Sequence, residues 1–177
     1  MPRHSRRDLL KRTAGALLAV PLLRPTSLVA LPDEPLLFFD LHEFHMVDEL
    51  SELILPADDH SPGARAAKVA AYIDQRLGES FETEPRRMWR DGLKRIDALS
   101  KEMHGRSFLD APPGERIVLL ERLAAREANP QVFEEIFFKD LKARTVRAYY
   151  TSKVGIHVEM KYLGNTYLED FSGFDAK

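Results

Sequence analysis

Apolar residues recur along this chain every three or four positions, and no segment of useful length alternates apolar and polar residues as a half-buried strand does. Proline and glycine divide the sequence into five periodic segments, near residues 40–55, 66–77, 83–104, 113–124 and 132–150. An amphipathic helix must bury its apolar stripe against a neighbour. The pattern therefore predicts an all-α fold of about five helices in a compact bundle-like domain. An irregular C-terminal tail follows, with room for one more helical turn.

Local signals predict where several of these helices begin and end. Asp40 followed by Glu43 fits a capping box at the start of the first helix, and Pro56 ends that helix. Gly78 and Gly105 are the predicted stops of the second and third helices. The predicted core stripes are Leu41, Phe44, Val47, Leu50 and Ile54; Ala66, Val69, Ala70, Ile73 and Leu77; Trp89, Leu93, Ile96, Leu99 and Met103; Ile117, Leu120, Leu123 and Ala124; and Val132, Phe133, Ile136, Phe137, Leu141 and Val146.

The first thirty residues have the pattern of an export signal. Ser5, Arg6, Arg7, Leu9, Leu10 and Lys11 match the twin-arginine pattern Ser/Thr-Arg-Arg-x-apolar-Leu-Lys. The uncharged stretch 13–23 that follows is too short to cross a bilayer as a helix and has the length of a signal h-region. The alternative is a basic amphipathic helix or a membrane anchor, but here basic and apolar residues are separated along the chain and not around a helix. We therefore expect the twin-arginine translocase to export the folded chain to the periplasm, with the signal either cleaved or kept as a tether.

These signals give a simple domain organisation. Residues 1–30 are the predicted twin-arginine signal peptide, and residues 40–177 are a single helical domain. Between them, residues 31–39 are predicted to be an extended linker, because Pro32 and Pro35 oppose helix formation. Four consecutive apolar residues, Leu36 to Phe39, indicate that this linker packs onto the domain.

Charge and cysteine content exclude several classes of function. Residues 1–30 hold six basic residues and one acid, so the rest of the chain has 20 basic and 27 acidic residues and a net charge of −7. An acidic body argues against nucleic acid as a partner. The chain has no cysteine, which excludes disulfides, thiolate-bound iron–sulfur clusters and covalent c-type haem.

Few residues suggest chemistry of their own. His42, His45 and Asp48 recur at three-residue spacing, so they could hold a metal on one helical face or form a solvated face. Asp58, Asp59 and His60 form an acidic loop that could be a calcium or acid–base site, but we expect Asp58 or Asp59 to cap the second helix. No G-x-G-x-x-G, G-x-x-x-x-G-K-[ST] or G-x-S-x-G motif is present. We therefore predict no catalytic, cofactor-binding or metal residues in this chain.

Aromatic residues are the candidates for contact with a partner protein. Phe and Tyr are enriched in the cores of protein interfaces. The predicted interface residues are Phe38, Phe39, Tyr149, Tyr150 and Tyr162. The alternative for the helical segments is that these side chains fill the internal core.

Several segments resemble the gluconate 2-dehydrogenase subunit 3 family. Residues 53–59 (LILPADD) with residues 61–64 (SPGA) are similar to that family's "L-I-x-P-A-D-D-x-x-P-G-A" opening. Residues 69–74 (VAAYID) resemble its next helix, which usually ends in "F/Y-I-D". Residues 149–152 (YYTS), Gly155 and residues 162–165 (YLGN) resemble its closing region, although Gly164 here follows Leu163 directly. The resemblance covers residues 40–174.

The resemblance implies a non-catalytic small subunit. Its partner is then a large FAD-containing dehydrogenase subunit of the glucose–methanol–choline type, which oxidises a sugar or an alcohol. In such complexes a cytochrome c subunit commonly passes the electrons onward, and the complex is attached to the inner membrane. The large subunit often lacks a signal, so the small subunit escorts it through the twin-arginine route. Two other readings stay open: a stand-alone periplasmic metal-dependent enzyme or binding protein that uses the face of His42, His45 and Asp48, and a chaperone that leaves its client after export.

Overall fold

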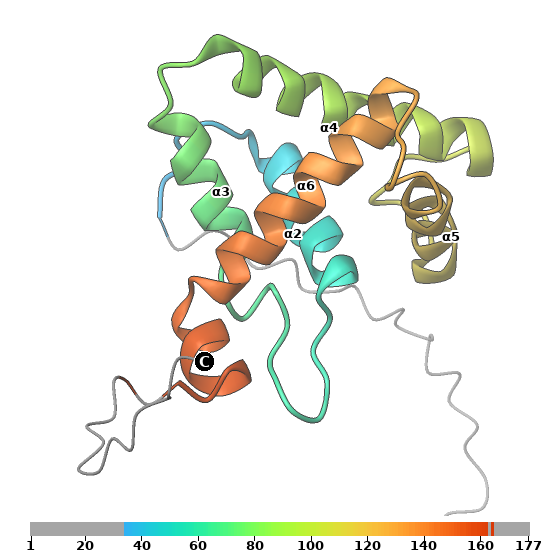
Figure 1. Cartoon of the computed structure of the whole chain (residues 1–177). Helices are drawn as coiled ribbons and strands as arrows, with labels where there is room; N and C mark the ends of the chain where they lie inside the picture. Colours follow the sequence, from blue (N-terminus) through green and yellow to red (C-terminus); the bar gives the residue numbers. More distant parts are fainter. Residues whose placement is uncertain (1–33, 163, 165–177) are drawn as a thin grey trace, which may run out of the picture. The chain divides into compact units, whose positions relative to one another are not determined.

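The computed structural model describes residues 34–162 and residue 164 (Figure 1). The predicted signal residues therefore lie outside the described part. The elements are α2 (Leu41–Ile54), α3 (Val69–Gly78), α4 (Thr83–His104), α5 (Pro113–Ala124), α6 (Phe133–Tyr150) and the π-helix η1 (Val154–Glu159). Residues 34–162 contain helices and no strand, which confirms the predicted all-α fold. None of the described helices combines the length and the apolarity that crossing a membrane requires.

Helix α6 is the centre of the domain. It packs against each of α2, α3, α4, α5 and η1, and Figure 1 shows it crossing in front of α2. Its buried face consists of Phe137, Phe138, Leu141, Thr145, Ala148 and Tyr149. The rings of Phe137 and of Trp89 in α4 meet in a T-shaped arrangement, with centroids 5.5 Å apart and an interplanar angle of 83°. The core is therefore built around one late helix of the chain.

The predicted helix signals are confirmed at two ends. At the start of α2, the Glu43 N–H donates to the Asp40 carboxylate over 2.8 Å, and the Asp40 N–H donates to the Glu43 carboxylate over 3.1 Å. At the end of α4, Gly105 takes the left-handed conformation with φ 71°. Past Ser152, the extra turn expected in the tail is present as η1.

The start of the second helix differs from the prediction. Helix α3 begins at Val69 and not near Ala66, because Lys68 has a left-handed backbone with φ 56° that interrupts a helix. The prediction that Asp58 or Asp59 caps this helix is wrong. The Asp58 carboxylate instead accepts the N–H groups of His60 and Ser61, over 2.7 and 2.8 Å, and closes a turn within its own loop.

The predicted apolar stripes are also corrected in part. Phe133 and Ile136 of α6 are 40% and 47% exposed, whereas Phe138, which was not in the predicted stripe, is buried. The buried face of α6 is therefore turned around the helix axis relative to the predicted stripe, because it has to meet five neighbouring elements. Five other residues of the predicted stripes are likewise exposed, namely Leu41, Ala66, Ile117, Ala124 and Val132.

The segment before α2 packs on the domain as predicted. Phe38 and Phe39 are buried, at 6% and 4% exposure. The backbone N–H groups of residues 37, 38 and 39 all donate to the carboxylate of Asp74 in α3, over 2.7, 3.0 and 2.7 Å. One buried side chain therefore satisfies three backbone donors that have no helical or sheet partner.

Two glycines give a matched test of the α4 end. Replacing Gly105 by alanine is expected to lower the free energy of unfolding by about 1 kcal/mol, because a Cβ is strained at φ 71°. Gly114→Ala, in the first turn of α5, is expected to have no effect or to raise it by up to about 1 kcal/mol. A Cβ would meet nothing within 4 Å at either position, so the backbone conformation is the difference between them. Chemical denaturation of both variants checks this, and equal effects would contradict the capping role of Gly105.

Candidate functional site

The face of His42, His45 and Asp48 does not form a metal site. The Asp48 carboxylate is held by the Arg65 guanidinium, with Nε and Oδ2 2.6 Å apart. His42 is exposed, and the buried Nε2 of His45 has no hydrogen-bond partner among residues 34–162. Within residues 34–162, no group of three or more His, Cys, Asp or Glu side chains is arranged to hold a metal ion. Within the described residues, the geometry of this face therefore gives the predicted metal-dependent alternative no support.

The loop between α2 and α3 is anchored by its own polar contacts. The hydroxyl of Tyr149 in α6 hydrogen-bonds to the Ser61 hydroxyl and donates to the Pro62 carbonyl over 2.7 Å. Arg65 reaches back to α2, where it pairs with Asp48 and, over 2.9 Å, with Glu49. These contacts tie the loop to α2 and to α6.

The acidic tip of this loop has a structural explanation. Hydrogen bonds from the backbone N–H groups of His60 and Ser61 lower the pKa of the Asp58 carboxyl group. An ionised carboxylate that accepts two backbone donors stabilises a turn and is poorly suited to accept a proton from a substrate. Asp58 is therefore a turn residue.

The five predicted interface aromatics fall into two groups. Phe38, Phe39 and Tyr149 are 6%, 4% and 4% exposed, so they fill the core of this chain. Tyr150 and Tyr162 are 37% and 50% exposed. The prediction of partner contact thus rests on Tyr150 and Tyr162, while the alternative of internal core describes the other three.

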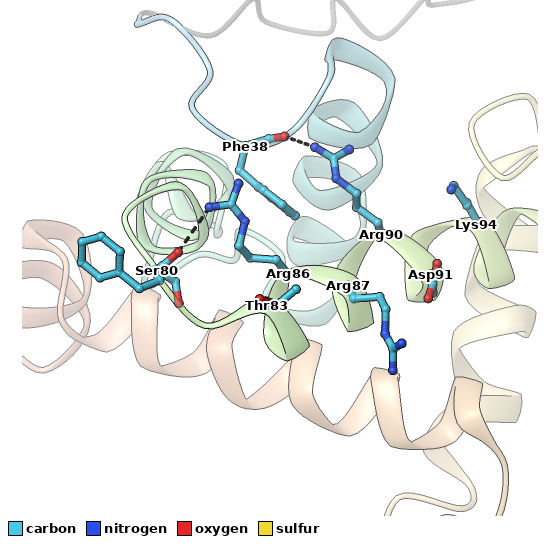
Figure 2. Close-up of a pocket in the computed structure, with 9 residues that line it drawn as sticks. Phe38, Ser80, Thr83, Arg86, Arg87, Arg90, Asp91 and Lys94 are labelled. Atoms are coloured by element: carbon cyan, nitrogen blue, oxygen red, sulfur yellow. Dashed lines mark hydrogen bonds between the residues drawn. The ribbon is translucent and has the colours of Figure 1, made fainter.

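A basic groove runs along the amino-terminal half of α4. We call it the α4 groove; its volume is about 580 Å³ and it is lined by Phe38, Ser80, Phe81, Thr83, Arg86, Arg87, Arg90, Asp91 and Lys94. Figure 2 shows Arg86 and Arg90 on either side of Phe38, Lys94 farther along α4, and Arg87 extending away from Phe38. Four basic side chains and one acidic side chain therefore share this groove.

Two of the basic side chains build the floor of the groove. The Arg90 guanidinium pairs with Glu43 over 2.7 Å and donates to the Phe38 carbonyl over 2.6 Å. Arg86 donates to the carbonyls of Gly78 and Ser80 over 3.4 and 3.2 Å. Both guanidinium carbons lie over the Phe38 ring, at 5.1 Å for Arg86 and 4.4 Å for Arg90. Arg86 and Arg90 thus stabilise the fold while they contribute charge.

The other two basic side chains of the groove contribute little to the stability of the domain. Arg87 pairs with Glu84 over 3.1 Å, but both side chains are strongly exposed, at 68% and 78%. An ion pair of this kind contributes little to stability. Lys94 is exposed and makes no ion pair or hydrogen bond within residues 34–162. These two cations are available to an external group.

A second hollow of about 480 Å³ adjoins the α4 groove. It shares Arg87 and Asp91 with the groove and is otherwise lined by Glu84, Pro85, Met88, Phe133, Ile136, Asp140 and Arg144. Its apolar lining includes Phe133 and Ile136, which the sequence pattern assigned to the core. We call the groove and this hollow together the α4 surface.

The apolar pattern of the sequence did not predict the α4 surface, although the sequence contains two signals for it. Arg86, Arg90 and Lys94 recur every four residues, which places three cations on one helical face. Phe81, which precedes the helix, belongs to no predicted stripe, and it is fully exposed in the structure. A search of the helix for a charged stripe beside the apolar stripe would have identified this surface.

Comparison with known proteins identifies one family. The family model described as gluconate 2-dehydrogenase subunit 3 matches residues 41–167. Neither a curated protein nor a solved structure matches the chain. The matched range contains every described helix, from α2 to η1, and therefore includes every residue that lines the α4 surface except Phe38.

Proposed function

Because the chain belongs to the gluconate 2-dehydrogenase subunit 3 family, we propose that it is the non-catalytic small subunit of a periplasmic sugar or alcohol dehydrogenase complex. The family match over residues 41–167 is the observation that carries this proposal. The large subunit of the complex is an FAD-dependent dehydrogenase of the glucose–methanol–choline type. The small subunit stabilises it and remains bound to it.

The sequence supports the assignment of the cofactors to other subunits. It carries no G-x-G-x-x-G loop, through which a Rossmann-type domain holds the pyrophosphate of FAD. It also carries no cysteine, so it offers no thioether attachment for haem c. In our proposal FAD belongs to the large subunit, and haem c to a cytochrome c subunit that passes the electrons onward.

The amino-terminal pattern supports a second part of the proposal, namely that this chain escorts the large subunit during export. Arg6 and Arg7 stand in a twin-arginine pattern, and that route transports folded proteins. A large subunit without a signal of its own can then cross the membrane while bound to this chain. The complex works in the periplasm, attached to the inner membrane through its other parts.

Purification from the native host tests this function. With a tag at the carboxyl terminus, the chain recovered from the periplasm is expected to bring a large FAD protein in fixed ratio, so the preparation is yellow. In the matched variant Arg6→Lys/Arg7→Lys, the FAD protein is expected to stay in the cytoplasm. The readouts are the flavin absorbance of the purified material and the dehydrogenase activity of the two cell fractions.

The purification and the double-lysine variant each have an outcome that would overturn one part of the proposal. A colourless single chain from the periplasm would refute the subunit role. Periplasmic dehydrogenase activity that is unchanged in the double-lysine variant would refute the escort role and leave the subunit role in place.

A further inference from the structure

We propose that the α4 surface docks an acidic segment of the large FAD subunit, an inference that rests on the function proposed above. The α4 groove receives the carboxylates of that segment. Phe81 and the adjoining hollow receive its apolar side chains.

The charge of the groove is the first argument. Within the described residues, many cations are paired with carboxylates, for example Arg116 with Glu49 over 2.6 Å. In the α4 groove, the part of the chain that the structure describes gives Arg86 no carboxylate partner, Arg87 only an exposed glutamate, and Lys94 no ion pair. These charges gather on a chain whose residues 31–177 carry a net charge of −7. A partner surface complementary to this groove is therefore acidic.

The arrangement of the cations favours an extended segment over a small anion. Arg86 and Lys94, with Arg90 midway, lie eight positions apart in α4, or about 12 Å along the helix axis. Arg86 and Arg90 are held in place by bonds to Gly78, Ser80, Glu43 and Phe38, so the charges do not converge on one point. Carboxylates spaced along a peptide fit this row better than one phosphate does.

The apolar part of the surface is the second argument. Phe81 lines the groove and is fully exposed, and Phe133 and Ile136 stand exposed in the adjoining hollow. Arg87 and Asp91 line both hollows, so the basic and apolar parts are continuous. Aromatic and arginine side chains beside an apolar patch are typical of the energetic centre of a protein interface.

A charge reversal that spares the fold gives the test. Arg87→Glu/Lys94→Glu removes the two cations that contribute least to the fold, and it leaves Arg86 and Arg90 in place. The matched control, Arg126→Glu/Lys153→Glu, makes the same change in charge at two exposed positions beyond the ends of α5 and α6. Both variants are purified from the periplasm of the native host, and the ratio of FAD to chain is measured. The groove variant is expected to lose at least about tenfold of the bound FAD protein, and the control is expected to keep it.

A photocrosslink provides a second measurement on a chain with an intact groove. With p-benzoylphenylalanine in place of Phe81, irradiation of the complex is expected to link the chain to an Asp- and Glu-rich peptide of the FAD protein. The same photoprobe in place of Glu121, which is exposed on α5, is expected to give no such link. If the groove variant fails to fold, the crosslink alone tests whether the α4 surface contacts an acidic segment of the FAD protein.

The outcomes separate this inference from the proposed function. If the wild-type chain brings no FAD protein, the proposed function fails and this inference with it. If the wild type and both charge variants bring the FAD protein equally, and residue 81 does not crosslink to it, only this inference fails. Binding of the wild-type chain to phosphatidylglycerol vesicles that the groove variant loses, with its FAD ratio unchanged, would overturn it in favour of a membrane. A crosslink from residue 81 to a second copy of the chain would overturn it as well.

Discussion

Replacing Asp74 by alanine is expected to lower the free energy of unfolding by about 3–5 kcal/mol. The Asp74 carboxylate is 3% exposed and accepts the N–H groups of Leu37, Phe38 and Phe39. Without it, three backbone donors lose their acceptor, and each buried donor left unpaired costs about 1–3 kcal/mol. The aromatic rings of residues 38 and 39 would also lose the anchor that holds them in the core.

The isosteric variant Asp74→Asn serves as the control. An asparagine can keep one oxygen toward the N–H groups of residues 38 and 39, but it turns an NH₂ group toward the N–H of Leu37. We expect a smaller loss of about 1–2 kcal/mol. Urea denaturation of the full chain measures both variants. A loss below about 1 kcal/mol for Asp74→Ala would show that the segment before α2 does not depend on this carboxylate.

Gly92→Ala is expected to destabilise the domain by about 2–3 kcal/mol, although alanine is the better helix former. Gly92 is buried in α4, and a Cβ at this position would lie well inside van der Waals distance of the Phe137 ring. Phe137 is fully buried and rigidly packed, so α4 and α6 would have to separate. Helix propensity alone predicts the opposite sign, a gain of about 1 kcal/mol.

A double-mutant cycle tests the cause of this destabilisation. In a Phe137→Leu background, where the ring is absent, Gly92→Ala is expected to cost less than about half of what it costs in the wild-type chain. Thermal unfolding of the four proteins gives the coupling between the two residues. A stabilising or additive effect of Gly92→Ala would mean that α4 and α6 do not approach each other as closely as the structure shows.

Short-range signals in the sequence predict the helices, and long-range contacts decide what they expose. Asp40 and Glu43 cap α2 across three residues, and Gly105 ends α4 by its own conformation, so both could be predicted locally. The acceptor for residues 37–39 is more than thirty positions away, at Asp74, and nothing in the local pattern indicates it.

The candidate site was harder to predict for the same reason. Phe133 and Ile136 have the spacing of core residues, and only the packing of α6 against all of its neighbours shows that they are exposed. Phe38 and Tyr149 are of residue types that are enriched in protein interfaces. Only the tertiary structure shows that they are buried within this chain. Periodicity gives the number of apolar faces, whereas the arrangement of the helices determines which of those faces remain in contact with solvent.

The central position of α6 also has a consequence for the order of events during synthesis. Every other described helix packs against residues 133–150, so a nascent chain that ends before residue 133 has no complete core. At a translation rate of about 5–20 residues per second, the 120 residues between positions 30 and 150 take about 6–24 s to synthesise. The amino-terminal segment therefore leaves the ribosome many seconds before the domain can become native. A transport route that accepts only native cargo must then wait until translation of α6 is complete.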